Sequence, residues 1–375
     1  MSILAIETSC DDTCAAVLEQ DGTIRSNVIS SQEQHSRFGG VVPEIASRHH
    51  LELIDAVVDE ALRRAESGLD EVELVAATQG PGLIGALLVG LSSAKAIAAA
   101  RELPFAAVDH LQGHVAANFV RGSAGGDGSA GGDAGAGGNG GAGTGAAAVD
   151  GAADGPEPFE PPFVCLIASG GHTLLARVTG HDGFEVLGST LDDAAGEAFD
   201  KGARMLGLGF PGGPALERLA AGGDPESFSF PGSPGERRGG RSPSRAAFAA
   251  GLDFSFAGVK TALLYRLREL SEAEREQRAG DLAASYQAAI VESLMSRTER
   301  ALRQSASDRL AVGGGVAANG ELRRRLGELD VEVHVPERSL CTDNAAMIAS
   351  AARFTERLEY PRYLDLDAYA SGERP

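Results

Sequence analysis

An internal repeat of a strand, a turn and a second strand constrains the fold more than any other feature of the chain. Residues 3–22 form the first copy and residues 164–183 the second. Each copy begins with an apolar run, passes through a turn of small residues and ends at an Asp-Gly pair, which favours a tight hairpin. The shift that aligns Thr8 with Ser169 also aligns Gly22 with Gly183. We therefore predict two similar α/β lobes whose turns face each other across a cleft.

The two turns carry hydroxyl and glycine residues that let backbone N–H groups approach an anion. A single turn of this kind is usually an ordinary hairpin, whereas a duplicated pair favours phosphate binding. Each lobe also contains a strand followed by a glycine turn and a helix start, at residues 74–83 and 310–319. Glycines there permit close approach of a nucleotide at a helix N-terminus, or simply close packing of helix on strand. The helical spacing of apolar residues in 281–304 predicts a core helix.

Two segments are too poor in large apolar side chains to predict a fold. Residues 122–162 are mostly Gly, Ala and Asp, and residues 232–246 are rich in Ser, Pro, Gly and Arg. We expect an N-terminal lobe over 1–121, a flexible insert over 122–162 and a C-terminal lobe over 163–375, with a flexible loop at 232–246. The C-terminal helix of the second lobe is free to pack back on the first.

Composition narrows the class of protein. The formal net charge of −20 repels nucleic acid unless basic residues such as Arg323, Arg324 and Arg325 gather on one face. The apolar tract over 82–100 contains serines and a lysine, which favours a buried helix over a membrane span. The four scattered cysteines lack a CxxC pair and suit reduced thiols. Together with an N-terminus unlike a signal peptide, these features predict a soluble cytoplasmic protein without membrane contact.

His110 and His114 form half of a metal site. On a helix, residues at this spacing share a face with Cβ atoms roughly 5–6 Å apart, so both rings reach one ion. Leu111 occupies the place where zinc proteases with the HExxH motif carry their glutamate base, which removes the catalytic residue of that class. The spacing alone is equally consistent with two histidines that bind nothing.

Ten sequence blocks, in order, match one family. They are IETSCDDT, GGVVPEIASRHH, GPGLIGALLVG, HLQGH, ASGGHT, DDAAGEAFDK, PGGP, DFSFAGVKT, GGGVAAN and CTDNAAMIA. The chain resembles, over roughly residues 3–352, the bacterial TsaD family of tRNA N6-adenosine threonylcarbamoyltransferases. The resemblance implies an α/β fold of the actin-like ATPase (ASKHA) type, with two duplicated lobes and a cleft for nucleotide and metal between them.

The resemblance also implies a third metal ligand, the aspartate of CTDN, which is Asp343 here. By residue type alone, Asp343 is more typical of an N-cap before the helix predicted over 345–352. Together with His110 and His114 it implies one divalent metal ion per subunit, with Fe²⁺ favoured and Zn²⁺ as the alternative.

The family reaction moves a threonylcarbamoyl group from threonylcarbamoyl-AMP to the N6 amine of adenosine 37, beside the anticodon of tRNAs that read ANN codons, and releases AMP. The resemblance implies a loop near the phosphate and metal, ribose contacts and a contact on the base side. The loop comprises Ile167, Ala168, Ser169, Gly170 and Gly171. The ribose contacts are Asp200, Gly213 and Glu217, and the contact on the base side is Asn319. Glu217 stands where many members carry an aspartate.

The general base stays open between Asp11 and Asp12 at the first turn and His172 beside the second. The resemblance implies tRNA and threonylcarbamoyl-AMP as ligands, and a paralogous actin-like subunit (TsaB type) and a small ATPase (TsaE type) as partners. These partners offset the acidic charge of the chain when tRNA binds. A metal-dependent endopeptidase, an ASKHA-type ATPase or kinase and a non-catalytic scaffold are the alternatives. The missing glutamate argues against the first, and the histidine pair with Asp343 argues against the others.

Overall fold

The computed structural model describes residues 1–32, 35, 38, 40–121, 158–231 and 251–370. The chain divides into two compact units. Unit 1 comprises Met1–Gln32, Pro43–Pro158 and Asp343–Pro375, and unit 2 comprises Glu33–Val42 and Phe159–Thr342.

A mixed five-stranded sheet forms the centre of unit 1, with the strand order β3-β2-β1-β4-β5. The strands are β1 (Ser2–Glu7), β2 (Asp12–Glu19), β3 (Ile24–Ser31), β4 (Val72–Gly80) and β5 (Phe105–Asp109). β1 pairs antiparallel with β2 and parallel with β4. β1 and most of β4 are buried, which explains their continuous apolar sequences.

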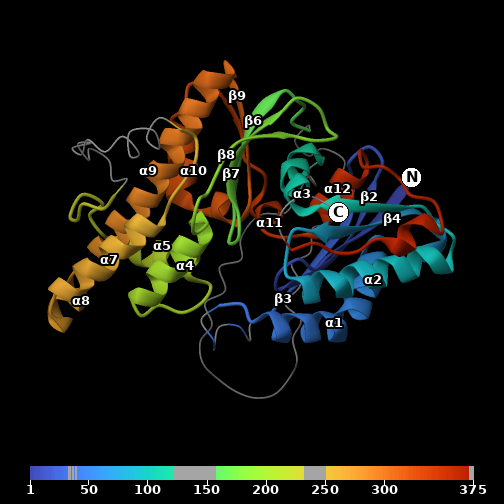
Figure 1. Ribbon diagram of the computed structural model, residues 1–375, viewed down its shortest axis with the longest axis horizontal. Helices are drawn as coiled ribbons and strands as arrows, with labels where there is room; N and C mark the ends of the chain where they lie inside the picture. The colour runs from blue at the N-terminus through green and yellow to red at the C-terminus, as the bar shows by residue number, and fades with distance from the viewer. Residues whose placement is uncertain (33–34, 36–37, 39, 122–157, 232–250, 371–375) are drawn as a thin grey trace. The chain divides into compact units, whose positions relative to one another are not determined.

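Helices cover both faces of this sheet (Figure 1). α1 (Pro43–Arg64) and α2 (Ile84–Ala100) lie together on one face, where Leu4 and Ile6 pack against Ile54 and Leu91. α3 (His110–Ala116) and α12 (Ala345–Ala352) lie on the other. α12 comes from near the C-terminus of the chain, yet it contacts β1, β2 and α3 of the same unit.

Unit 2 repeats the same arrangement. Its sheet has the order β10-β9-β6-β7-β8, built from β6 (Phe163–Ala168), β7 (Thr173–Val178), β8 (Glu185–Ser189), β9 (Arg309–Gly313) and β10 (Glu332–His334). Read from its other edge, this order matches that of unit 1 strand for strand. β6 pairs antiparallel with β7 and parallel with β9, as β1 does with β2 and β4. The duplicated α/β architecture predicted from the sequence repeat is confirmed.

Most helices of unit 2 pack on α9, which lies against β6 and β7 of the sheet. The described helices of this unit are α4 (Ala195–Met205), α5 (Gly212–Ala220), α7 (Ala257–Glu269), α8 (Glu272–Gln277), α9 (Ala279–Ser305), α10 (Gly320–Leu326) and α11 (Arg338–Cys341). The core centres on α9, whose Tyr286 is fully buried and donates a hydrogen bond to the carbonyl of Ala198 at 2.8 Å. The core helix predicted over 281–304 is therefore confirmed as α9.

The compact units differ from the predicted lobes at three places. Glu33–Val42, inside the predicted N-terminal lobe, belongs to unit 2. Asp343–Pro375 lies inside the predicted C-terminal lobe of 163–375 but belongs to unit 1, in line with a C-terminal helix that packs back on the first lobe. Phe159, inside the range assigned to the insert, is buried in unit 2, where it stacks on His334 and packs against Phe163. Residues 122–157 of that insert, and the loop at 232–246, lie outside the described residues.

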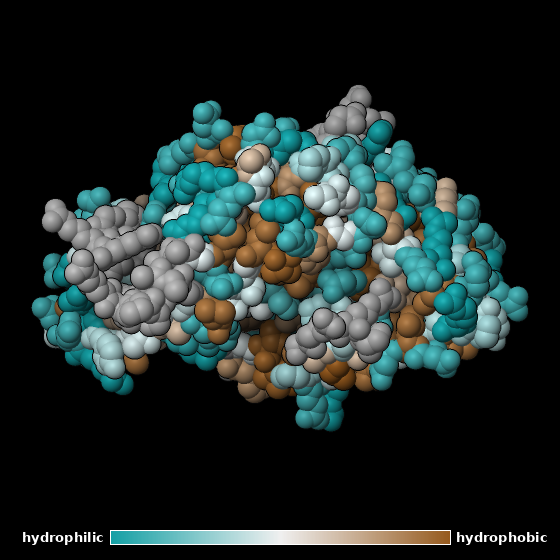
Figure 2. Space-filling model, turned by 45° about the horizontal axis from the view of Figure 1, so that its top comes forward, coloured by the Kyte–Doolittle hydropathy of each residue, from teal (hydrophilic) through white to brown (hydrophobic). Residues whose placement is uncertain are grey.

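The described surface is dominated by polar groups. Figure 2 shows a face on which hydrophilic residues predominate, with apolar groups between them. Among the described helices, none combines the length and the hydrophobicity needed to span a bilayer. The four cysteines are free thiols.

Candidate metal centre and nucleotide-binding residues

α3 begins where β5 ends, and Asp109 makes the transition. The Oδ1 atom of Asp109 accepts hydrogen bonds from the backbone N–H groups of Leu111 at 2.9 Å and Gln112 at 3.0 Å. These groups have no acceptor within the helix, so the aspartate acts as an N-cap. The Tyr369 hydroxyl donates to the other oxygen of Asp109 at 2.5 Å. The cap fixes the direction of α3 and with it the two histidines that follow.

Close packing of α12 on α3 brings Asp343 to the histidines. A Cβ atom on Gly113 would lie 2.7 Å from Cδ1 of Ile348, so a larger residue there would force the Ile348 side chain to move. Asn344, not Asp343, caps α12, because its Oδ1 accepts from Met347 N at 2.9 Å. The N-cap role typical of an aspartate before a helix thus falls to its neighbour, and the Asp343 side chain turns toward α3.

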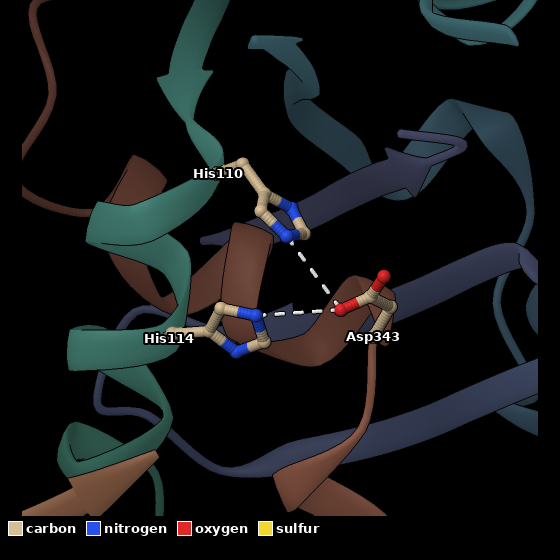
Figure 3. A group of neighbouring side chains, drawn as sticks. All are labelled: His110, His114 and Asp343. Carbon is tan, nitrogen blue, oxygen red and sulfur yellow. Dashed lines mark ion pairs between the residues drawn. The ribbon is translucent and has the colours of Figure 1, made fainter. Parts of the chain in front are cut away.

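The three side chains converge on one point (Figure 3). Oδ1 of Asp343 lies 3.3 Å from Nε2 of His114 and 3.6 Å from Nε2 of His110. One ligand atom from each residue lies within 4.8 Å of the other two. The histidine rings are edge to face, with centroids 4.7 Å apart. Both histidines are buried and Asp343 is partly exposed, so the group is a pocket of donors with one open side.

The donor set fits a divalent metal ion. Among the described residues, neither ring nitrogen of the fully buried His114 has a hydrogen-bond partner. An unsatisfied buried polar atom costs about 1–3 kcal/mol, and a metal bond at Nε2 removes that cost for one of the two nitrogens. Two imidazoles and one carboxylate with open positions suit Fe²⁺ or Zn²⁺.

Glu7, at the end of β1, is a fully buried carboxylate behind this group. Its Oε1 accepts from the backbone N–H of Ser9, and its Oε2 accepts from the Thr78 hydroxyl at 2.5 Å. Nδ1 of His110 lies 3.2 Å from the same Oε2 and 3.2 Å from the Ser9 hydroxyl. Glu7 thus connects β1, β4 and α3 through polar contacts inside an apolar core.

Glu7 and His110 form an ion pair in this group. Burial acts to raise the pKa of Glu7, but the charge and the hydrogen bond of His110 outweigh it and lower that pKa. Burial acts to lower the pKa of His110, but the charges of Asp343 and Glu7 outweigh it and raise the pKa to about 9. The pocket therefore favours positive charge between its two carboxylates, which a divalent cation also supplies.

The first turn carries Asp11 and Asp12, both half-buried. His50 on α1 holds this turn, because its Nδ1 lies 2.8 Å from the Thr13 hydroxyl and its Nε2 3.0 Å from the carbonyl of Cys10. Burial, together with the charges of Asp11, Asp343 and Glu7, raises the pKa of Asp12 to about 7 despite a hydrogen bond to Ser31. A carboxyl group with a pKa near 7 exchanges protons readily at physiological pH.

The predicted phosphate loop lies at one end of the unit 2 sheet. Ile167 of β6 pairs with Gly313 of β9, so the turn after Ala168 and the glycine turn at 313–315 lie beside each other. Gly314 has a φ of +88°, and a Cβ atom there would lie 2.4 Å from the carbonyl oxygen of Ala168. Apart from the adjacent residues, no atom of the described part of the chain lies within 4 Å of a Cβ built on Gly170 or Gly171, so packing among those residues does not require glycine there. His172 closes the turn by donating its backbone N–H to the Ser169 hydroxyl at 3.1 Å.

The residues predicted to contact the ribose and the base lie in unit 2, where they form two pairs of adjacent residues. Asp200 on α4 accepts from Gly212 N at 2.8 Å, which places it beside Gly213 at the start of α5. Glu217 on α5 accepts from Gly320 N at 2.8 Å, and Asn319 caps the same helix, α10, by accepting from Leu322 N at 3.0 Å. The Asn319 amide also donates to Gln287 at 2.9 Å.

Two polar groups escaped the sequence analysis. Glu7 follows four apolar residues at the end of the first predicted strand. A carboxylate at a buried strand position is itself a sign of a paired group. Asp193 pairs with the amines of Lys201, at 2.8 Å, and Lys260. It thereby joins the start of α4 to α7, and the scarcity of lysine in the chain was the available clue.

Comparison with known proteins shows to which family the chain belongs. The profile of TsaD, described as tRNA N6-adenosine threonylcarbamoyltransferase, matches residues 23–126 and 145–350. The chain belongs to the TsaD family. The resemblance seen in the sequence blocks is confirmed, and the protein is a transferase that modifies tRNA.

Curated relatives of the TsaD family match nearly the whole chain. The tRNA N6-adenosine threonylcarbamoyltransferase of Caldicellulosiruptor saccharolyticus is 42% identical over 94% of this chain and 93% of its own length. That of Clostridium perfringens strain SM101 is 43% identical over 94% of this chain and 92% of its own length.

Solved structures support the fold. HypF from T. kodakarensis has a TM-score of 0.56 at 13% identity, covering 94% of this chain and 47% of that one. Component A of the Acidaminococcus fermentans (R)-2-hydroxyglutaryl-CoA dehydratase has a TM-score of 0.50 at 13% identity, covering 97% of this chain and all of that one. The predicted ASKHA-type fold, with two α/β lobes, is confirmed.

The Asp109 cap predicts a measurable loss of stability. Asp109→Ala should lower the free energy of unfolding by about 1 kcal/mol, because two N–H groups at the start of α3 lose their acceptor. Unfolding in guanidinium chloride followed by circular dichroism measures the effect. Asp109→Asn retains a capping oxygen and should recover most of the loss, while Tyr369→Phe isolates the hydroxyl contact. Equal losses for the alanine and asparagine variants would contradict the capping role.

Proposed function

We propose that this chain transfers the threonylcarbamoyl group from threonylcarbamoyl-AMP to the N6 amine of adenosine 37 in tRNAs that read ANN codons. The observation that carries the proposal is the match to the TsaD family over residues 23–126 and 145–350. That match includes the pocket of His110, His114 and Asp343 and the proposed nucleotide residues of unit 2. The proposed bond changes are one C–N bond formed at N6 and one acyl C–O bond broken, with AMP as the leaving group.

In the proposal, His110, His114 and Asp343 hold one divalent ion, Fe²⁺ in preference to Zn²⁺. A bound divalent ion acts as a Lewis acid toward an acyl or phosphoryl oxygen and stabilises the charge that develops there by several kcal/mol. The three residues present buried nitrogens and one carboxylate oxygen toward a common point. This donor geometry supports the assignment, as does the lack of a hydrogen-bond partner for either ring nitrogen of His114 among the described residues.

The adenylate is assigned to unit 2. Residues 167–171 are assigned to the phosphate. The backbone N–H of Ser169 already donates to the carbonyl of His172, so the donors proposed for the phosphate are the N–H groups of Gly170 and Gly171. Asp200, Gly213 and Glu217 are assigned to the ribose, because carboxylate oxygens accept hydrogen bonds from hydroxyl groups. Asn319 is assigned to the base side, where its second amide N–H is available beside the one that contacts Gln287.

Asp12 is proposed as the group that accepts the proton released from N6, with Asp11 beside it in the same turn. Its burial and its acidic neighbours raise its pKa to about 7, so that it is a stronger base than an exposed aspartate. His172 is the rival, because it stands beside the phosphate loop.

The acidic chain requires help to bind tRNA. A net charge of −20 opposes approach to a polyanion. We therefore propose that a paralogous actin-like subunit of TsaB type and a small ATPase of TsaE type assemble with this chain.

Removing both imidazoles tests the metal site and the reaction together. Cells depleted of the protein should regain threonylcarbamoyladenosine in their tRNA when complemented with the wild-type chain, but not with His110→Ala/His114→Ala. Mass analysis of tRNA nucleosides measures the modification, and elemental analysis of the purified chains should show about one divalent ion lost per chain. His181→Ala, in an exposed pair with Glu160, is the control and should restore the modification. Restoration by the double variant would refute the proposal.

The pKa of Asp12 predicts how transfer depends on pH. Only the ionised carboxylate accepts a proton, so the transfer rate should rise with pH through about 7, where Asp12 loses its own proton. Asp12→Asn should lower the rate by about 10²-fold or more and abolish this rise, while Asp12→Glu retains it. Single-turnover rates between pH 6 and 8 measure both effects, with the exposed Asp21→Asn as control. An unchanged rise in Asp12→Asn would move the role of base to His172.

Partner dependence is tested with purified components. The chain alone, given threonylcarbamoyl-AMP and unmodified tRNA, should transfer at only a small fraction of the rate reached after the two partner types are added. The physical reason is charge repulsion, so the deficit of the isolated chain should grow as ionic strength falls. Nucleoside analysis of the tRNA measures transfer. Full transfer by the chain alone would exclude the partner requirement.

A further inference from the structure

The two histidines of the metal pocket differ in what lies behind them. Each turns Nε2 toward Asp343. Behind His110, Nδ1 meets Glu7 and the hydroxyl of Ser9. Behind His114, Nδ1 has no hydrogen-bond partner among the described residues. Only one of the two proposed ligands is therefore held from behind by a polar group in the described part of the chain.

The surroundings of Glu7 determine which nitrogen of His110 carries the proton. The backbone N–H of Ser9 and the hydroxyl of Thr78 both donate to the carboxylate. A carboxylate that receives two donors from fixed neighbours is an acceptor toward its third partner as well. Nδ1 of His110 must then carry hydrogen and donate it to Oε2. The lone pair of the neutral ring is consequently left on Nε2, the atom nearest Asp343.

We propose that Glu7 is a positioning residue, which fixes the orientation and the tautomer of His110 so that Nε2 is presented to the metal ion. Thr78 on β4 and the backbone of Ser9 hold the carboxylate, and the sheet thereby holds the ligand. A carboxylate behind a ligating histidine fixes the ring and raises its basicity. The inference rests on the proposed metal site, and it assigns to Glu7 a role distinct from binding the ion.

Metal affinity tests the inference without reference to transfer activity. The full-length metal-free chain is titrated with Co²⁺, and binding is followed by visible absorption. Wild type should bind one ion, and Glu7→Gln should bind about 10- to 100-fold more weakly, because the uncharged amide cannot accept from all three donors at once. Thr78→Val, which removes one donor to Glu7 and keeps the shape of the side chain, should weaken binding less than Glu7→Gln.

The control separates this role from general stability. Ser26→Ala removes a buried hydrogen bond of 2.7 Å to the carbonyl of Ala61 in the same unit, away from the pocket. It should lower the melting temperature without changing the affinity for Co²⁺. If wild type bound no Co²⁺, the proposed metal site would fail. If wild type bound it and Glu7→Gln bound it within twofold as well, the role of Glu7 would fail and the metal site would stand.

A spectroscopic measurement on wild type shows which nitrogen of His110 carries hydrogen, even if the Glu7 variant does not fold. In the Zn²⁺-loaded chain labelled with ¹⁵N-histidine, two-bond ¹⁵N–¹H correlations report which ring nitrogen carries hydrogen. His110, assigned by its loss in His110→Ala, should show a protonated Nδ1 and a metal-bound Nε2. The reverse pattern, with hydrogen on Nε2, would overturn the inference. In a folded Glu7→Gln chain the signal of the protonated Nδ1 should weaken or shift.

Discussion

The close packing of α12 on α3 is the contact on which the metal pocket depends. Asp343 lies far along the chain from the histidines and reaches them only because the two helices touch at Gly113. The hydroxyl of Ser350 strengthens this contact by donating to the carbonyl of Ala116 at 2.8 Å. Side-chain burial, one glycine and one hydroxyl thus set the distance between the third donor and the other two.

The two turns of the duplicated fold have acquired different chemistry. In unit 1, Glu7 pairs with Cys14 across a longer turn that carries two aspartates, and the end of β1 is a buried carboxylate. In unit 2, Ala168 pairs with Thr173 across a shorter turn of small residues, and the end of β6 is a methyl group. A duplicated scaffold therefore presents acidic groups beside the His110, His114 and Asp343 cluster in one copy and a glycine turn in the other.

Much of the fold was predictable, because hairpins and strand-turn-helix units are local patterns. The repeat gave the two sheets, and the spacing of His110 and His114 gave two of the three clustered donors. Asp343 came only from resemblance, since no spacing rule connects residues so far apart. Glu7 was missed because the continuous apolar run over residues 3–6 predicts a buried strand and says nothing of the carboxylate at its end. The hydrogen bonds of Glu217 and Asn319 were equally hidden, because both residues meet at the start of α10 through tertiary structure.

The order of the residues in the chain sets when the pocket can form. The carboxylate that completes it is residue 343, and the tyrosine that supports the cap of α3 is residue 369, of 375. Because residues 159–342 belong to unit 2, His110 and His114 are synthesised before the whole of that segment and Asp343 after it. The three donors therefore come together only after the main segment of unit 2 has been synthesised.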